Sequence, residues 1–182
     1  MKNNIIDAIF IDRDGTIGGT GNFIHPNNFE LYPFTPTSLE LLKKNDFKIF
    51  ALTNQHRISR NEATLDDFIN SFKSYGFDDY FICPHAINEP CNCKKPQDGL
   101  LLQAKEKYDL NLKNCIIIGD VGSTDMLLAH NVNCTKILVK TGWGEASLGP
   151  YRHTWSQVAA DYVAENLLDA VYWILSNFSS SL

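Results

Sequence analysis

The sequence predicts an α/β protein whose core is a doubly wound parallel sheet. Short, nearly continuous apolar runs recur along the chain, and segments with apolar residues at helical spacing lie between them. Unbroken apolar runs are typical of parallel strands that helices cover on both faces. Alternating strands and helices imply right-handed crossovers, and such sheets bind ligands at the carboxyl ends of their strands.

The predicted strands are rich in β-branched and aromatic residues, and they cover residues 5–11, 47–52, 80–83, 115–119 and 136–139. One predicted helix begins at Thr35-Pro36, a second includes residues 68–75, and three others cover residues 98–108, 123–130 and 164–177. The Thr35-Pro36 pair is a signal for an N-cap and a first helical turn. The last helix gathers its leucine, valine and isoleucine residues on one face, as packing against a sheet requires.

The size of the chain limits the number of domains. With 182 residues, of which 44% are hydrophobic, the chain can bury one sizeable core but is too short for two ordinary domains. We therefore expect one domain over residues 1–178 and a tail at residues 179–182 whose serines fray. The connections between the predicted elements are too short to hold a large cap domain.

Net charge and the first residues of the chain exclude several classes of partner. The net charge is −5, so we expect no broad basic face for binding nucleic acid. The start, MKNNIIDAIFID, is interrupted by two aspartates and fits neither a secretory signal nor a membrane span. We expect a cytoplasmic protein without nucleic-acid or membrane partners, and a monomer, because the sequence predicts few apolar segments at the surface.

Two carboxylates directly follow the first predicted strand, in Asp12-Arg13-Asp14-Gly15-Thr16. A carboxylate attacks phosphorus only if a cation screens its repulsion from the phosphate, and a second acid nearby can protonate the leaving oxygen. Two aspartates two positions apart can divide these tasks. Taken alone, the same residues also fit a fragment of a calcium loop or an ordinary turn.

Three further polar groups fall at strand ends or helix starts. Thr53-Asn54-Gln55 supplies hydrogen-bond donors, and Lys94-Lys95-Pro96 supplies ammonium groups for a phosphate. Asp120 and Asp125 supply oxygen ligands of the kind that magnesium prefers. Each group alone has an ordinary explanation, as a helix cap or as solvated lysines. Parallel strands end at one edge of the sheet, so we expect the groups to meet there.

The ordered set Asp-x-Asp-Gly-Thr, Thr-Asn-Gln, Lys-Pro and Gly-Asp-x4-Asp resembles the four signature motifs of the haloacid dehalogenase (HAD) superfamily, over about residues 5–144. The resemblance implies a Rossmann-like HAD fold and a phosphatase that depends on Mg²⁺. It makes Asp12 the nucleophile, which becomes an aspartyl-phosphate, and Asp14 the general acid and base. Mg²⁺ would be held by Asp12, by the backbone carbonyl of Asp14 and by Asp120.

The same resemblance assigns residues that bind the phosphoryl group. Thr53 and Lys95 would hold it, and Asp125 would orient a water or Lys95 from behind the metal ligands. We further expect Asn54, Arg60 and Lys94 to bind the substrate.

Four metal-ligating side chains lie within eleven positions: Cys83, His85, Cys91 and Cys93. Such a Cys3His set is typical of a closed, tetrahedral zinc site, which holds structure and leaves no place for a reactive water. We therefore expect Zn²⁺ to fix a loop over residues 83–96. This loop would deliver the phosphoryl-binding lysine in a fixed position.

The spacing CxHx5CxC before Lys-Lys-Pro resembles the branch of the superfamily that contains D-glycero-D-manno-heptose 1,7-bisphosphate phosphatases and histidinol-phosphatase domains. This resemblance implies a small phosphorylated substrate, either a sugar phosphate or bisphosphate or histidinol phosphate. The chain departs from the heptose pattern at His56-Arg57, where small residues are usual, and at Lys94, where Arg is usual. Lys cannot reproduce the bidentate fork that Arg offers to a second phosphate. Substrate choice would rest on loops 17–34, 55–61 and 84–96.

Two other functions stay open. A polynucleotide 3′-phosphatase family shares the first two motifs, although the acidic net charge and the zinc loop argue against that activity. A zinc-organised interaction module without catalysis is the second alternative. It has no chemical need for both Asp12 and Asp14, and both are present.

Overall fold

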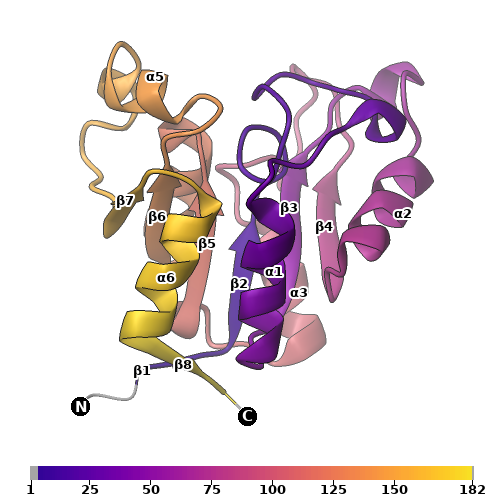
Figure 1. The fold of residues 1–182 in the computed structure, drawn as a ribbon. Helices are drawn as coiled ribbons and strands as arrows, with labels where there is room; N and C mark the ends of the chain where they lie inside the picture. Colours follow the sequence, from indigo (N-terminus) through magenta and orange to yellow (C-terminus); the bar gives the residue numbers. More distant parts are fainter. Residues whose placement is uncertain (1–3, 182) are drawn as a thin grey trace.

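The structure is a computed structural model that describes residues 4–181, and it confirms the predicted parallel sheet. Six strands form the main sheet: β2 (Ala8–Ile11), β3 (Ile49–Asn54), β4 (Asp79–Cys83), β5 (Cys115–Gly119), β6 (Thr135–Val139) and β7 (Tyr162–Ala164). Their order across the sheet is β4-β3-β2-β5-β6-β7, and all neighbours are parallel (Figure 1). The chain builds outward from β2 on one side and then on the other, so the carboxyl ends of β2, β3 and β5 flank the point where strand order reverses. Ligands bind at such a point in open α/β sheets.

Helices cover both faces of this sheet (Figure 1). They are α1 (Thr35–Lys44), α2 (Leu65–Tyr75), α3 (Gly99–Tyr108), α4 (Leu127–Asn131), α5 (Gly144–Leu148) and α6 (Leu167–Asn177). Buried Ile9 and Ile49 belong to the core beneath α1, α2 and α6, whereas Phe10 and Phe50 belong to the core beneath α3 and α4. Alternate residues of a strand point to opposite faces, so the apolar runs fill two cores at once.

The first predicted strand is two strands, because the chain breaks its pairing at Asp7. That carboxylate accepts a hydrogen bond from the backbone N of Asn111 at 2.8 Å. Before the break, β1 (Asn4–Ile6) pairs in parallel with β8 (Phe178–Ser180). The prediction that the serines of the tail fray was therefore wrong for Ser179 to Ser181, the last of which donates from its backbone N to Ile6 O at 3.0 Å. Residue 182 lies outside the described residues.

Three helix boundaries differ from the prediction. The last helix, expected from residue 164, begins at Leu167, because Ala164 ends β7, a strand that the sequence did not predict. The N-cap of α1 is Phe34, and the hydroxyl of Thr35 donates instead to the carbonyl of Ile17 at 2.8 Å, which ties the long loop after β2 to the helix. The helix expected over residues 123–130 opens with a wider π-helical turn, Gly122–Met126, before α4. Such turns occur often at functional sites, and this one carries Asp125.

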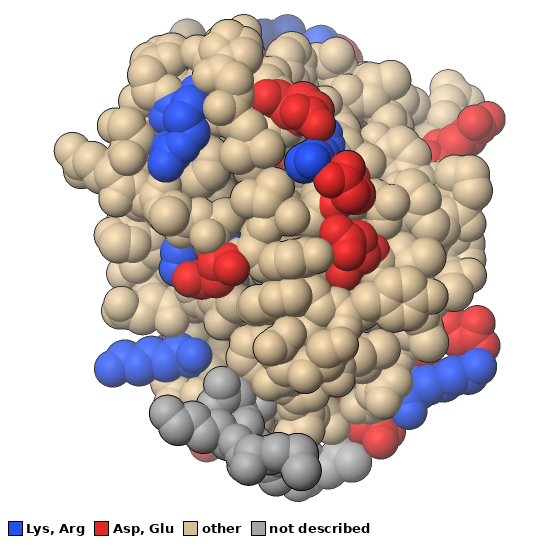
Figure 2. Space-filling view, turned by 60° about the vertical axis from the view of Figure 1, so that its left-hand side comes forward, with Lys and Arg blue, Asp and Glu red and all other residues tan. Residues whose placement is uncertain are grey.

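Charges of both signs are interspersed over the face that Figure 2 shows, with wide uncharged areas between them. Among residues 4–181, no helix combines the length and apolar composition needed to cross a bilayer.

Candidate functional site

A cavity of about 150 Å³ opens at the carboxyl ends of β2, β3 and β5, where the sequence places its polar motifs. We call it the phosphate cavity. Its lining includes six of the predicted site residues: Asp12, Asp14, Thr53, Asn54, Lys95 and Asp120. Residues from four distant parts of the sequence therefore converge because parallel strands end at the same edge.

Lys95 lies at the centre of this group, with a side chain that is only 3% exposed. Its ammonium donates to Asp12 Oδ1 at 2.9 Å, to Asp125 Oδ1 at 2.6 Å and to the carbonyl of Leu52 at 3.0 Å. Burial alone disfavours the charged ammonium, but the two carboxylates outweigh it and raise the pKa of Lys95. Lys95 is therefore a fixed positive charge beside the predicted nucleophile.

Three buried carboxylates form an acidic cluster around the same point. Oxygens of Asp12, Asp120 and Asp125 lie within 4.8 Å of one another. Asp120 Oδ2 accepts from the backbone N of Trp143 at 2.7 Å, while Asp120 Oδ1 is buried and has no hydrogen-bond partner among the described residues. Burial, followed by the charges of Asp12 and Asp125, raises the pKa of Asp120 well above its usual range. An unpartnered oxygen among crowded carboxylates fits a site for a hard cation such as Mg²⁺.

Asp14 stands apart from that cluster and has its own partners. Its Oδ2 accepts from Gln55 Nε2 at 2.6 Å, and its Oδ1 accepts from Arg13. Burial raises the pKa of Asp14 to about 6, against the lowering effect of Arg13. A carboxyl group that titrates near neutrality can both give and take a proton at physiological pH, as a general acid and base must.

The sequence reasoning missed two residues that hold Asp14. The Arg13 side chain is fully buried, with its guanidinium 3.7 Å from the ring centroid of Phe29 and 5.0 Å from that of Phe68. Gln55 donates to Thr53 Oγ1 at 3.0 Å as well as to Asp14. Gln55 belongs to the Thr-Asn-Gln motif, and membership of that motif is the signal by which it could have been predicted as a site residue. The position of Arg13 in the sequence does not indicate that its guanidinium is buried between aromatic rings.

Two glycines allow the backbone to approach Asp120 closely. Gly15 has φ +82° and Gly142 has φ +57°, which side-chain-bearing residues rarely adopt. A Cβ at either position would overlap the Asp120 carboxylate. The hydroxyl of Thr141 donates to Gly15 O at 2.7 Å and joins the two turns.

The four predicted zinc ligands come together at the end of β4. His85 Nδ1 lies 3.1 Å from Cys93 Sγ and 3.5 Å from Cys83 Sγ, and Cys91 Sγ lies 3.8 Å from Cys83 Sγ. Nitrogen and sulfur ligands placed tetrahedrally around one zinc ion are about 3.5 to 3.8 Å apart, given the usual bond lengths. The cluster therefore has nearly the size that a zinc ion requires, and its cysteines form no disulfide.

The predicted substrate-binding residues have mixed placements. Asn54 lines the phosphate cavity, but its side-chain amide bonds to the backbone of Lys95, through Lys95 N at 2.9 Å and Lys95 O at 3.2 Å. Lys94 does not line the cavity, because its ammonium donates to three loop carbonyls, those of Ala86, Ile87 and Glu89. Arg60 also lies outside the lining, with a side chain 56% exposed. Asn54 and Lys94 therefore hold the loop 83–96 in place, Asn54 through the backbone of Lys95 and Lys94 through the three loop carbonyls.

Comparisons with known proteins agree with this geometry. A family model for HAD-hydrolase-like proteins matches residues 92–170. The D-glycero-beta-D-manno-heptose-1,7-bisphosphate 7-phosphatase of Escherichia coli (strain K12) is 30% identical, covering 90% of this chain and 91% of the relative. Its namesake from Helicobacter pylori (strain J99) is 32% identical, covering 92% and 96%.

A solved structure also resembles the fold over nearly its whole length. D,D-heptose 1,7-bisphosphate phosphatase from B. bronchiseptica, complexed with magnesium and phosphate, superposes with a TM-score of 0.77 at 25% identity, covering 94% of this chain and 99% of that one. These matches confirm the resemblance seen in the four motifs. The chain belongs to the HAD-like phosphatase family that includes the heptose-bisphosphate 7-phosphatases, and it is a phosphoric monoester hydrolase.

Proposed function

We propose that the protein removes one phosphate from a small phosphorylated sugar through an aspartyl-phosphate on Asp12, and that D-glycero-D-manno-heptose 1,7-bisphosphate is the substrate. One observation carries the chemistry: Asp12 lies between a buried ammonium, Lys95 at 2.9 Å, and Asp120 of the acidic cluster, whose Oδ1 has no hydrogen-bond partner among the described residues. A nucleophile, a phosphate-binding cation and a cation-binding acid thus share one cavity. The names of the curated relatives support the choice of sugar.

Mg²⁺ would be held by Asp12, by Asp120 and by the backbone carbonyl of Asp14. When bound, it screens the repulsion between the Asp12 carboxylate and the phosphate oxygens. The excess of buried carboxylates over ammonium groups supports this assignment, as does the magnesium in the B. bronchiseptica relative.

The chain's own residues would then divide the reaction. Asp12 Oδ1 accepts the Lys95 hydrogen bond, so Oδ2 is the oxygen that attacks phosphorus. As the bond between phosphorus and the sugar oxygen breaks, Asp14 gives its proton to that oxygen and the sugar leaves. Asp14 then takes a proton from the water that attacks the aspartyl-phosphate, which releases phosphate and restores Asp12. Thr53 and Lys95 would bind the phosphoryl oxygens throughout.

Zn²⁺ would be held by Cys83, His85, Cys91 and Cys93, with a structural role. Four protein ligands leave no position for a reacting water. The loop they hold also carries Lys95, whose backbone is already bound by Asn54 of β3. Zinc would therefore keep the phosphoryl-binding ammonium in register with the strand that carries Thr53.

Basic side chains lie on the side of the phosphate cavity toward His56, which lines it. Burial, then the charges of Arg57 and Arg60, lowers the pKa of His56, so these guanidinium groups act on that side of the cavity. Arg57 is occupied by Glu62, through bonds of 2.8 and 3.1 Å. Arg60 is held only at 4.0 Å by the same carboxylate, so we propose that Arg60 is the guanidinium able to contact the substrate from this side.

Phosphate release tests this function directly. The panel contains heptose 1,7-bisphosphate, other sugar phosphates, histidinol phosphate and a 3′-phosphorylated oligonucleotide, each with magnesium and with excess EDTA. Release from the sugar phosphates that EDTA abolishes is the expected result. Preference for histidinol phosphate or the oligonucleotide would replace the sugar by that substrate, and no release from any would favour a non-catalytic interaction module.

We also propose that the enzyme is monomeric and cytoplasmic and has no nucleic-acid partners. The net charge of −5 supports the absence of nucleic-acid partners.

A further inference from the structure

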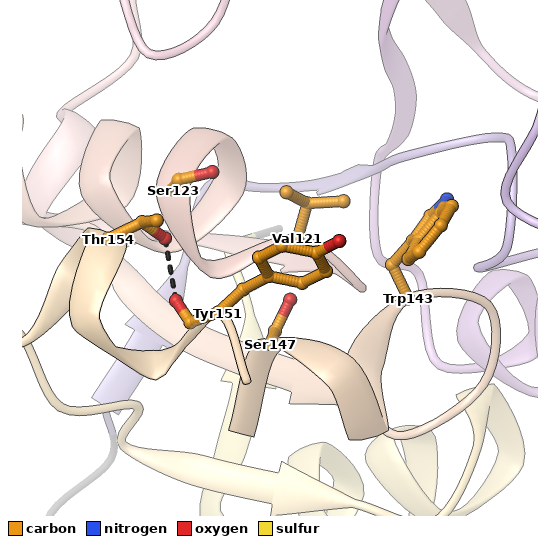
Figure 3. A pocket seen from close by; sticks show the side chains of 6 residues that line it. All are labelled: Val121, Ser123, Trp143, Ser147, Tyr151 and Thr154. Carbon is orange, nitrogen blue, oxygen red and sulfur yellow. Dashed lines mark hydrogen bonds between the residues drawn. The ribbon is translucent and has the colours of Figure 1, made fainter. Parts of the chain in front are cut away.

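A second cavity, of about 300 Å³, adjoins the phosphate cavity. Figure 3 shows the side chains that line it: Val121, Ser123, Trp143, Ser147, Tyr151 and Thr154. Val121 lines both cavities and directly follows Asp120 of the acidic cluster. The second cavity therefore begins one residue away from a predicted metal ligand.

Trp143 forms the partition between the two cavities. Its backbone N donates to Asp120 Oδ2 at 2.7 Å. Its indole packs against Gly21, where an added Cβ would collide with the ring, and Gly21 lines the phosphate cavity. The indole is 38% exposed and lines the second cavity. A molecule bound to both cavities would therefore contact Val121, which lines both, and could reach the Trp143 ring in the second.

The second cavity combines aromatic rings with hydroxyl groups. Tyr151 is 49% exposed, and its ring lies 6.2 Å from that of Trp143 at 68°. Ser147 is occupied, since its hydroxyl donates to Asp120 O at 2.9 Å, but Ser123 and the Tyr151 phenol present hydroxyls at the cavity. Among the described residues, those lining the cavity include no Lys, Arg or His. This composition suits an uncharged ligand with hydroxyl groups and gives a phosphate no cation.

We propose that this second cavity binds the uncharged, hydroxyl-bearing body of the sugar while the reacting phosphate occupies the phosphate cavity. The proposal rests on the proposed function. The C–H faces of a sugar are apolar and pack on aromatic rings, while its hydroxyls bond to hydroxyl side chains. A volume of about 300 Å³ is at the lower end of the range for small-molecule sites. Trp143 and Tyr151 are thereby the residues that select a sugar over a smaller phosphate ester.

The test compares a sugar phosphate with acetyl phosphate, which has no sugar body. In Tyr151→Ala, the ratio of kcat/KM for heptose bisphosphate to kcat/KM for acetyl phosphate should fall about five- to tenfold, which is the usual worth of one aromatic contact. Tyr151→Phe keeps the ring and should restore most of the ratio. Tyr172→Ala is the matched control, because Tyr172 is 55% exposed on α6 and outside this cavity. An unchanged ratio in Tyr151→Ala overturns the proposal.

A binding measurement separates this proposal from the proposed function. Asp12→Asn protein, which should not consume the ligand, is titrated with heptose bisphosphate and with inorganic phosphate while tryptophan fluorescence is recorded. The sugar phosphate should change the emission, phosphate should change it much less, and Trp143→Phe should remove the difference. Of the other two tryptophans, Trp155 is only 3% exposed and Trp173 packs on Tyr162 from α6, outside the lining of both cavities, so the response reports mainly on Trp143. Equal responses to both ligands, or a response that survives Trp143→Phe, reject the second cavity even if turnover is normal. A wild type that hydrolyses neither heptose bisphosphate nor acetyl phosphate rejects the proposed function instead.

Discussion

Lys95 Nζ lies 2.6 Å from Asp125 Oδ1, and their side chains are 3% and 1% exposed. The ion pair joins the loop 83–96 to the π-helical turn after β5, two segments that the sequence separates by 30 positions. The other oxygen of Asp125 accepts from the backbone N of Val121 at 3.1 Å, so the carboxylate is fixed at both ends. Asp125 therefore orients the ammonium that faces Asp12.

Asp125→Ala tests this positioning role. Loss of one partner leaves a buried ammonium with Asp12 as its only carboxylate, so the free energy of unfolding should fall by about 3 to 5 kcal/mol. Turnover should fall at least tenfold, because Lys95 would turn fully to the proposed nucleophile. Urea unfolding and phosphate release measure the two effects. Glu106→Ala, at an exposed position of α3, is the control for loss of a surface charge. A stable, fully active Asp125→Ala protein would show that the ion pair has no such role.

Asp12→Asn separates chemistry from folding. The amide keeps the size of the side chain and can still accept the Lys95 hydrogen bond, but it cannot attack phosphorus. We expect turnover to fall by about a thousandfold or more, with an unchanged circular dichroism spectrum. Transfer of ³²P to the wild-type protein, and its absence from the variant, checks the covalent step. Full activity in the variant would exclude the aspartyl-phosphate mechanism.

The sequence predicted most of this site because its residues occupy strand ends. Asp12 and Asp120 directly follow β2 and β5, Thr53 lies at the carboxyl end of β3, and the topology of a parallel sheet brings such positions together without further information. The adjacent lysines show where this reasoning stops. Both carry the same charge, yet Lys95 enters the cavity and Lys94 turns back to three carbonyls. The conformation of the loop determines which lysine enters the cavity, and the spacing of residues in the sequence does not predict that conformation.

The second cavity could not be predicted from the sequence for a related reason. Trp143 and Tyr151 flank α5, a helix of five residues that is too short to give a periodic signal. Their rings meet only because the chain folds back after β6 over the carboxyl edge of the sheet. Gly21, against which Trp143 packs, comes from the opposite end of the chain.

Cys91→Ser should release the metal from the cysteine cluster. A hydroxyl is a poor zinc ligand, so the variant should contain little zinc by elemental analysis, and its KM should rise because Lys95 is no longer held. Cys134→Ser is the matched control, since the Cys134 thiol donates to Leu112 O at 3.0 Å and a hydroxyl can do the same. Equal zinc content in both variants would argue against a metal at this cluster.

Gln55→Ala tests whether the amide aligns Asp14 with Thr53. Its Nε2 donates to both side chains, at 2.6 and 3.0 Å. Without it, both groups gain freedom at the reacting phosphate, so we expect kcat to fall about tenfold to a hundredfold while zinc content stays constant. Steady-state kinetics with a sugar phosphate provides the measurement. Gln55→Glu should be worse than Gln55→Ala, because it adds a negative charge beside Asp14; the reverse order would contradict the alignment role.

Asp79 lies outside the active site and should make the free energy of unfolding depend on pH. Its Oδ2 accepts from Lys107 Nζ and from the Tyr108 hydroxyl, both at 2.8 Å, and Oδ1 accepts from Tyr80 N at 2.8 Å. Burial acts to raise the pKa of Asp79, but these hydrogen bonds outweigh it and lower the pKa below its usual range. A lowered pKa in the folded state means that the carboxylate stabilises the fold above the unfolded-state pKa of about 4.

Asp79→Asn should therefore reduce the free energy of unfolding by about 1 kcal/mol at pH 7, a modest value because Lys107 is 61% exposed and its ion pair is screened by solvent. The difference between wild type and variant should shrink as the pH falls below about 4, because the wild-type carboxylate then takes up a proton and loses the same interactions. Urea unfolding of both proteins at pH 7, 5 and 3.5 measures this. Lys107→Met should reproduce part of the loss at pH 7. A difference that stays constant, or grows, toward acid would mean that Asp79 is not stabilised as an anion by these three donors.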